Sequence, residues 1–138
     1  MYDFKQDKII SFPTLTLIGE AAKGDFCTGV LCSSLWKLWD TFGEPPMDTE
    51  ALFYAIQSLS FGKPVVFFRV EEEGFSLSEY ELCLNSLDKA IPNNSPLGAL
   101  FLPKVGTGEI IEHSLEICIV HAGILIMNDK DFFDYLAA

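Results

Sequence analysis

One segment constrains the fold more than any other, the run Pro-Val-Val-Phe-Phe-Arg-Val at residues 64–70. β-Branched and aromatic residues favour extended structure, and Gly62 precedes the run while Glu-Glu-Glu-Gly follows it. These residues predict a strand over 64–70 and a turn over 71–74. A second β-branched segment with alternating apolar residues predicts another strand over 9–19. The chain therefore needs a sheet.

Two helices are predicted in the region between these two strands. In 33–42 the apolar residues recur at intervals of three and four, a serine can cap the first turn, and Trp39 is expected on the core side. A second helix is expected over 48–59, with Asp48 or Thr49 as its N-cap. The segment between the first strand and the first helix is expected to be a loop.

Two later runs fit either a helix or a strand. The run 77–87 alternates like a strand, although it opens like a helix capping box, and 109–122 is rich in β-branched residues but follows a glycine. Strands are expected over 98–105 and 124–127. This order of elements indicates an α+β fold with a mostly antiparallel sheet. The length predicts a single domain over 1–138.

Charge excludes several classes of partner. The chain has 20 acidic and 9 basic residues and a net charge of −11, so it has little means of neutralising phosphates or an anionic membrane surface. The longest uncharged stretch, 90–103, is shorter than the ~18–20 residues that a bilayer span needs. No basic and apolar leader opens the chain. We expect a soluble, cytoplasmic protein that binds neither nucleic acid nor membrane.

Cysteine and histidine give no sign of a metal site. Neither Cys27-x4-Cys32 nor His113-x7-His121 has the spacing of a standard zinc quartet, so no metal and no cofactor are expected. No Gly-x-Ser-x-Gly elbow indicates a serine nucleophile. The glutamates at 71–73 are expected to form a solvated turn. No catalytic residue is assigned.

Aromatic side chains are the candidate ligand-binding groups, because they come from separate predicted elements and several of them can meet. We expect Phe67, Tyr80 and Tyr135 to converge from three strands, with Phe101 on the same groove. Glu116 is expected to supply the nearby carboxylate. A groove of this kind suits flat molecules that are apolar or cationic, through stacking and cation–π contacts.

Several short motifs also follow one another in a recognisable order. They are an extended opening that ends in glycine (1–19), Leu38-Trp39-x-x-Phe42, the strand at 64–70, Tyr80-Glu81-Leu82, the run Gly-Ala-Leu-Phe-Leu-Pro-Lys-Val-Gly (98–106) and the tail Asp131-Phe132-x-x-Tyr135. Their order resembles that of the gyrase-inhibitor-like effector-binding domains. Phe133 stands where that family has a glutamate.

The resemblance implies a specific architecture. Two similar β-helix-β-β units would lie side by side, and their strands would form a mostly antiparallel curved sheet with helices on one face. The ligand groove would lie between the units. The resemblance also implies a strand over 78–85, a helix over 109–121 and a terminal strand in the tail.

Three functions follow from these observations. The first is non-enzymatic binding of a small hydrophobic or cationic aromatic ligand, as in a bacterial stand-alone effector-binding domain. The second is an acidic inhibitor or immunity-type protein that docks a basic protein partner, because a charge of −11 would steer it onto a basic surface. A hydrolase of hydrophobic electrophiles ranks last, since the sequence brings no pair of reacting groups together.

Overall fold

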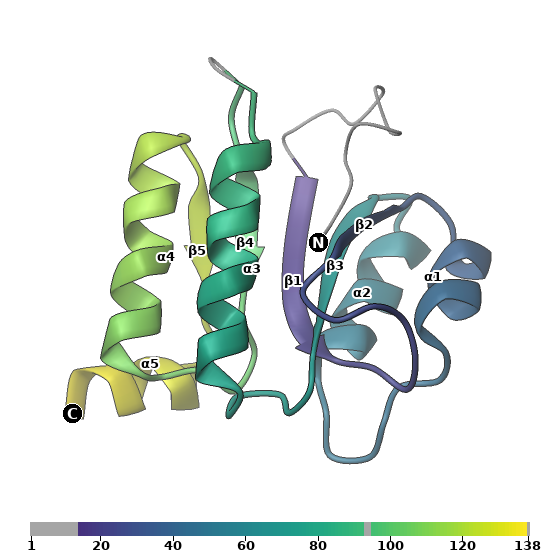
Figure 1. Ribbon diagram of the computed structural model, residues 1–138, viewed down its shortest axis with the longest axis horizontal. Helices are drawn as coiled ribbons and strands as arrows, with labels where there is room; N and C mark the ends of the chain where they lie inside the picture. Colours follow the sequence, from purple (N-terminus) through teal and green to yellow (C-terminus); the bar gives the residue numbers. More distant parts are fainter. Residues whose placement is uncertain (1–13, 93–94, 138) are drawn as a thin grey trace.

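The computed structural model describes residues 14–92 and 95–137. Within them, one mixed sheet has the strand order β2-β3-β1-β4-β5 (Figure 1). The strands are β1 (Thr14–Glu20), β2 (Gly29–Cys32), β3 (Val65–Val70), β4 (Gly98–Phe101) and β5 (Ile124–Ile126). The helices are α1 (Leu35–Phe42), α2 (Ala51–Ser60), α3 (Leu77–Ala90), α4 (Gly108–Val120) and α5 (Asp129–Ala137). None of these described helices is long and apolar enough to cross a membrane.

The sheet is mostly parallel. Strand β1 lies at its centre and runs parallel to both β3 and β4, β5 runs parallel to β4, and β2 pairs antiparallel with β3. Helices and strands both occur as expected, but the expectation of a mostly antiparallel sheet is wrong. The reason is that α3 joins β3 to β4 and α4 joins β4 to β5, and a helical crossover returns the chain to the same direction.

Helices cover both faces of the sheet. In β3, Val66 and Phe68 pack in a core beneath α3 and α4, while Val65 and Phe67 pack in a second core beneath α1 and α2. A strand that is buried on both faces reads as a continuous apolar run, which is what residues 64–70 show. The expectation of helices on one face is therefore wrong. The curved sheet and the two β-helix-β-β units are not confirmed.

The ambiguous run at 77–87 is helical. Tyr80, Cys83, Leu84 and Leu87 are buried on one side of α3, at the spacing of an α-helix, whereas Leu82 is 57% exposed. The strand expected over 78–85 is wrong, because the three-and-four spacing of the core residues outweighs the local alternation.

Other expectations have mixed outcomes. The helix expected over 109–121 is confirmed by α4, and the strand at 124–127 by β5. The tail forms α5 rather than the terminal strand that the resemblance implies. Strand β2 was not expected, since only four residues form it at the edge of the sheet. Of the first expected strand, residues 9–13 lie outside the described residues.

Helix α1 has two apolar sides, and only one of them faces the sheet. Ser34 caps it as expected, accepting a hydrogen bond from the Lys37 N–H at 3.1 Å. Leu38 and Phe42, one turn apart, are buried, and the Phe42 ring lies 4.7 Å from that of Phe67. Trp39 is 53% exposed, so its expected place in the core is wrong.

The different burial of Phe42 and Trp39 predicts different losses of stability when each ring is removed. Phe42→Ala should lower the free energy of unfolding by about 3–5 kcal/mol, because it leaves a cavity in the core. Trp39→Ala should cost about 1 kcal/mol or less, because its ring is half-exposed. Urea unfolding of both variants measures the two costs. A larger loss for Trp39→Ala than for Phe42→Ala would contradict this packing.

Candidate functional site

The five residues expected to line one groove lie apart. Phe67 and Phe101 are buried on the side of the sheet covered by α1 and α2. Tyr80 is buried on the opposite side, and Tyr135 of α5 packs against that same core. Glu116 is exposed on α4. The sheet separates Phe67 from Tyr80. The structure therefore groups Phe67 with Phe101 and Tyr80 with Tyr135, but it does not bring the five residues together in one groove.

A buried carboxylate stands at the carboxyl end of the central strands. Glu73, in the loop after β3, is only 3% exposed, although the glutamates at 71–73 were expected to be solvated. Its carboxylate accepts hydrogen bonds from the backbone N–H groups of Glu20 at 3.1 Å, Glu50 at 2.6 Å and Ala51 at 3.4 Å. Glu50 and Ala51 form the first turn of α2, so Glu73 does the capping expected of Asp48 or Thr49.

Gly19 allows strand β1 to lie very close to the start of α2 and to the Glu73 carboxylate. A Cβ added to Gly19 would lie 2.2 Å from the Ala51 Cβ and 2.5 Å from a Glu73 carboxylate oxygen. Only a residue without a side chain lets β1 pass so close to the start of α2. The absence of a side chain at Gly19 therefore lets the Glu73 carboxylate lie against both β1 and α2.

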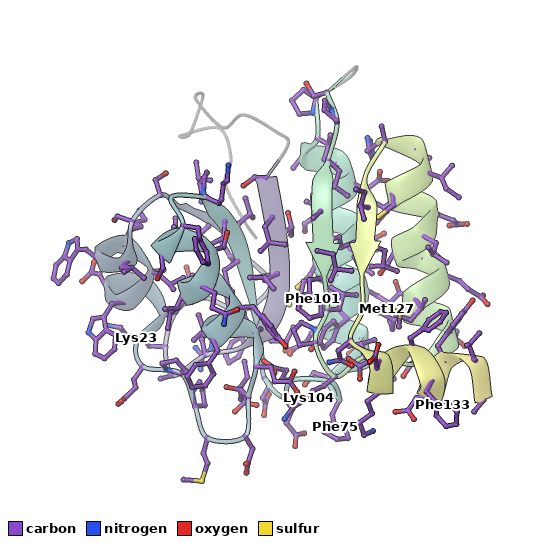
Figure 2. The ribbon with its side chains drawn as sticks, turned by 180° about the vertical axis from the view of Figure 1, so that it is seen from behind. Lys23, Phe75, Phe101, Lys104, Met127 and Phe133 are labelled. Carbon is purple, nitrogen blue, oxygen red and sulfur yellow. The ribbon has the colours of Figure 1, made fainter. Side chains whose placement is uncertain are left out.

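The rest of this edge is also held together by internal hydrogen bonds. The Gly74 N–H donates to the Tyr80 hydroxyl at 2.8 Å, and the Lys104 N–H donates to the Asp131 carboxylate at 2.8 Å. The Lys104 ammonium donates to the Asp48 carbonyl. Figure 2 shows Lys104 and Phe101 at this end of the sheet. These side chains bind backbone groups of their own chain, so the cluster ties loops together.

The cysteine thiols are poorly suited to nucleophilic chemistry. Cys32, Cys83 and Cys118 are buried, and Cys27 is half-buried. Burial raises the pKa of Cys118 to about 11 and also raises the pKa of Cys27. Their thiolate fraction at neutral pH is therefore small. In the described part of the chain, no group of three or more His, Cys, Asp or Glu side chains could hold a metal ion.

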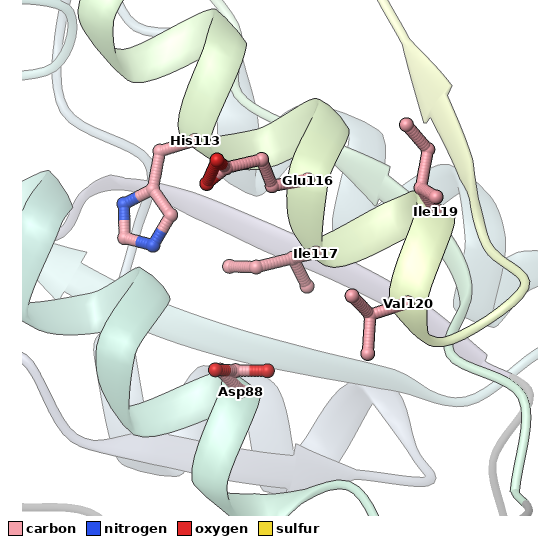
Figure 3. A pocket seen from close by; sticks show the side chains of 6 residues that line it. All are labelled: Asp88, His113, Glu116, Ile117, Ile119 and Val120. Atoms are coloured by element: carbon pink, nitrogen blue, oxygen red, sulfur yellow. The ribbon is translucent and has the colours of Figure 1, made fainter.

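A hollow lies between α3 and α4, with a volume of about 390 Å³ (Figure 3). It is lined by Asp88, His113, Glu116, Ile117, Ile119 and Val120. Two side-chain hydrogen bonds join the helices around it: His113 with Glu81, and His121 with Asp88 at 2.7 Å. The acidic partners of both histidines come from α3. The hollow thus lies at a helix contact that two histidine–carboxylate hydrogen bonds span, and Glu116 is the one expected site residue on it.

A second hollow, the α1–α2 groove, has a different character. It has a volume of about 360 Å³ and is lined by Leu35, Trp36, Leu38, Trp39, Gly43, Leu52 and Ile56. No charged side chain lines it. Trp36 is 73% exposed and Trp39 53% exposed, while Leu38 and Leu52 form the buried floor. Two large rings thus stand at the rim of an apolar hollow.

The backbone at the end of α1 shapes this groove. Gly43 has a φ of +77°, and its N–H donates to the Trp39 carbonyl at 2.8 Å. A left-handed residue ends the helix abruptly, directly after the turn that carries Trp39. The groove is therefore built from regular elements that a fixed turn holds in place.

Comparison with family models, with curated proteins and with solved structures gives no match. The function must therefore follow from the geometry. Sequence reasoning missed the α1–α2 groove because it placed Trp39 in the core. A signal was present: α1 has eight residues, and five of them are apolar or aromatic, more than one face of so short a helix can bury.

The buried carboxylate predicts a particular pH dependence. Burial raises the pKa of Glu73 despite its backbone hydrogen bonds, so between the ordinary carboxyl pKa of about 4.3 and the raised value the folded state binds more protons than the unfolded state. The contribution of Glu73 to stability therefore falls as pH rises through this window. Glu73→Gln should remove that decline, measured by urea unfolding from acid to neutral pH.

The exposed neighbour Glu72 provides the control. Glu72→Gln should keep the pH profile of the wild type, because the side chain is solvated. Asp131, whose pKa burial also raises, adds a decline of the same sign in all three proteins. If the wild type gains stability over Glu73→Gln as pH rises, the inferred direction is contradicted.

Proposed function

We propose that this protein binds a small planar aromatic ligand, neutral or cationic, in the α1–α2 groove. The single observation that carries the proposal is the pair of exposed tryptophans at the rim of an apolar hollow. The binding role is the one implied by the resemblance to the effector-binding domains, but its support here is this groove. Phe67, Tyr80, Phe101, Glu116 and Tyr135 are not part of it.

Size and chemistry support a small ligand. A volume of about 360 Å³ falls within the ~300–1,000 Å³ typical of small-molecule sites, which are mostly apolar. Indole rings offer large flat faces for stacking, and tryptophan is the best cation–π partner among the aromatic residues. Leu38 and Leu52 give the floor on which an apolar ring would rest.

Charge supports a preference for cations. No basic side chain lines the groove, and the chain has a net charge of −11. A cationic aromatic would gain from this negative field, and a neutral aromatic would bind through stacking and burial alone. An anionic aromatic would be excluded. The proposal needs no catalytic group, and it includes a cytoplasmic location, which the free thiols of Cys27, Cys83 and Cys118 support.

Intrinsic fluorescence tests the proposal directly. The chain has two tryptophans, Trp36 and Trp39, so all of its indole emission reports on the groove. Titration with acridine orange, a planar aromatic cation, should quench this emission to saturation. Trp36→Ala should weaken binding about tenfold, equal to the ~1.4 kcal/mol of one lost stacking partner, with Trp39 as the remaining reporter.

A matched control separates the groove from general surface adsorption. Phe61 is 82% exposed and does not line the groove, so Phe61→Ala should bind the dye like the wild type. Quenching that does not saturate, or equal affinities for Trp36→Ala and Phe61→Ala, would rule out the groove as the ligand site.

A basic protein partner is the second candidate, and the net charge of −11 favours it. Electrostatic steering would accelerate association, and the exposed tryptophans would anchor the complex. Association rates with a basic partner should fall steeply as ionic strength rises. Stopped-flow rates that are independent of salt would argue against this second function.

A further inference from the structure

Two cysteine thiols meet where the loop between β1 and β2 packs against α3. Cys27, in this loop, packs against the core beneath α3 and α4, and Cys83 of α3 is buried in that core. The Cys27 thiol donates to the Glu79 carbonyl at 3.8 Å. In an α-helix this carbonyl also accepts the N–H four residues later, which is that of Cys83. The Cys27 sulfur therefore lies beside the helical turn that carries Cys83.

The two thiols form a hydrogen bond with each other, and they are not equivalent. Cys27 is half-buried and reachable from solvent, whereas Cys83 has no exposed surface. Burial raises the pKa of both thiols, while the hydrogen bond between them lowers the pKa of Cys27 and raises that of Cys83. Cys27 is thus the thiol that ionises first and meets an oxidant, and Cys83 is a protonated partner within reach of it.

The backbone holds Cys27 in a conformation that few residues other than glycine adopt. Its φ is +54°, in the left-handed region. The Cys27 N–H donates to the Arg69 carbonyl at 2.8 Å. The Arg69 guanidinium donates to the Gly24 carbonyl and lies 4.0 Å from the centre of the Phe26 ring. Such a backbone persists only where its surroundings hold it, and it is often found at functional groups. Here the functional group is the sulfur beside α3.

We propose that Cys27 and Cys83 form an oxidation-sensitive thiol pair, which a hydroperoxide converts into a disulfide that ties the loop 21–28 to α3. With hydrogen peroxide, the Cys27 thiolate attacks one oxygen, an S–O bond forms, and the O–O bond breaks. The second oxygen leaves as hydroxide and takes up the proton that Cys27 released, which gives water. The product at Cys27 is a sulfenic acid.

Cys83 completes the reaction. Its sulfur attacks the sulfenic sulfur of Cys27, an S–S bond forms and the S–O bond breaks, and the Cys83 proton leaves with the oxygen as water. Two thiols are oxidised to one disulfide, and one hydrogen peroxide molecule is reduced to two waters. Because burial keeps the thiolate fraction small, the first step is slow, so the pair stays reduced until the oxidant persists. Exchange with small thiols restores both cysteines.

The loop connects this thiol pair to the end of α1. The Ala22 and Lys23 N–H groups both donate to the Phe42 carbonyl, at 3.2 and 3.3 Å. Phe42 is the last residue of α1, and Gly43 after it lines the α1–α2 groove. A disulfide at Cys27 therefore restricts the segment that holds this helix end. It should also stabilise the fold, because a cross-link between residues distant in the sequence restricts the unfolded chain.

Counting thiols before and after treatment with hydrogen peroxide tests the proposal. In denaturant, the oxidised wild type should have lost two of its four thiols, and peptide mapping without reductant should find Cys27 joined to Cys83. Dithiothreitol should restore both. Cys27→Ser and Cys83→Ala should each form no intramolecular disulfide. Cys118→Ala removes another buried thiol of the same core and should form the disulfide as the wild type does. Circular dichroism checks that each variant is folded.

Two further measurements show whether the disulfide ties down the loop. Amide hydrogen exchange at Ala22 and Lys23 should slow by about tenfold or more in the oxidised wild type, because the loop opens less often. The midpoint of urea unfolding should rise, and peroxide-treated Cys27→Ser should show neither change. Thiols that all survive peroxide, a sulfinic acid at Cys27 without a disulfide, or a different thiol pair would overturn the proposal. So would a Cys27–Cys83 disulfide that leaves both measurements unchanged.

Discussion

The structure depends on a strand that is apolar on both faces. Val65 and Phe67 of β3 require one layer of helices, and Val66 and Phe68 require another. Because α3 joins β3 to β4 and α4 joins β4 to β5, the helical layer on one face makes most of the sheet parallel. The place of the α1–α2 groove follows from the same constraint, since α1 and α2 form one of these layers.

The fold also needs hydrogen-bond partners for the backbone amides of the helix ends that lie at the edge of the sheet. Helix α2 begins with no side-chain cap from its own first residues, and Glu73 from the loop after β3 satisfies its amides. That arrangement buries a carboxylate and requires a glycine at position 19. In open parallel sheets, ligands commonly bind at the carboxyl ends of the strands. Here the Glu73 carboxylate lies at that end and stabilises the fold instead.

Local patterns in the sequence predicted the elements better than their arrangement. The strand at 64–70, helix α1 and its Ser34 cap were predictable because the signals are local. The run 77–87 stayed open between helix and strand because Tyr80, Leu82 and Leu84 alternate, and the resemblance wrongly favoured a strand, whereas the burial of Cys83 and Leu87 reveals the helical face. The parallel sheet could not be predicted once α3 was read as a strand. The α1–α2 groove was missed because its position depends on tertiary packing. Helix α1 has two apolar sides, and the sequence does not show that the side with Leu38 and Phe42 is the one that meets the sheet.

The central position of β1 has a consequence for how the chain folds during synthesis. Leu15 pairs with Val65 on one side and with Ala99 on the other, so the first described strand to be made finds its neighbours late. Until β3 leaves the ribosome, Leu17 and Ile18 have no sheet to join, and the second neighbour comes later still. Folding is therefore controlled by the closure of long chain segments rather than by the formation of local helices, which slows it and extends the time during which the nascent chain exposes an unpaired hydrophobic strand.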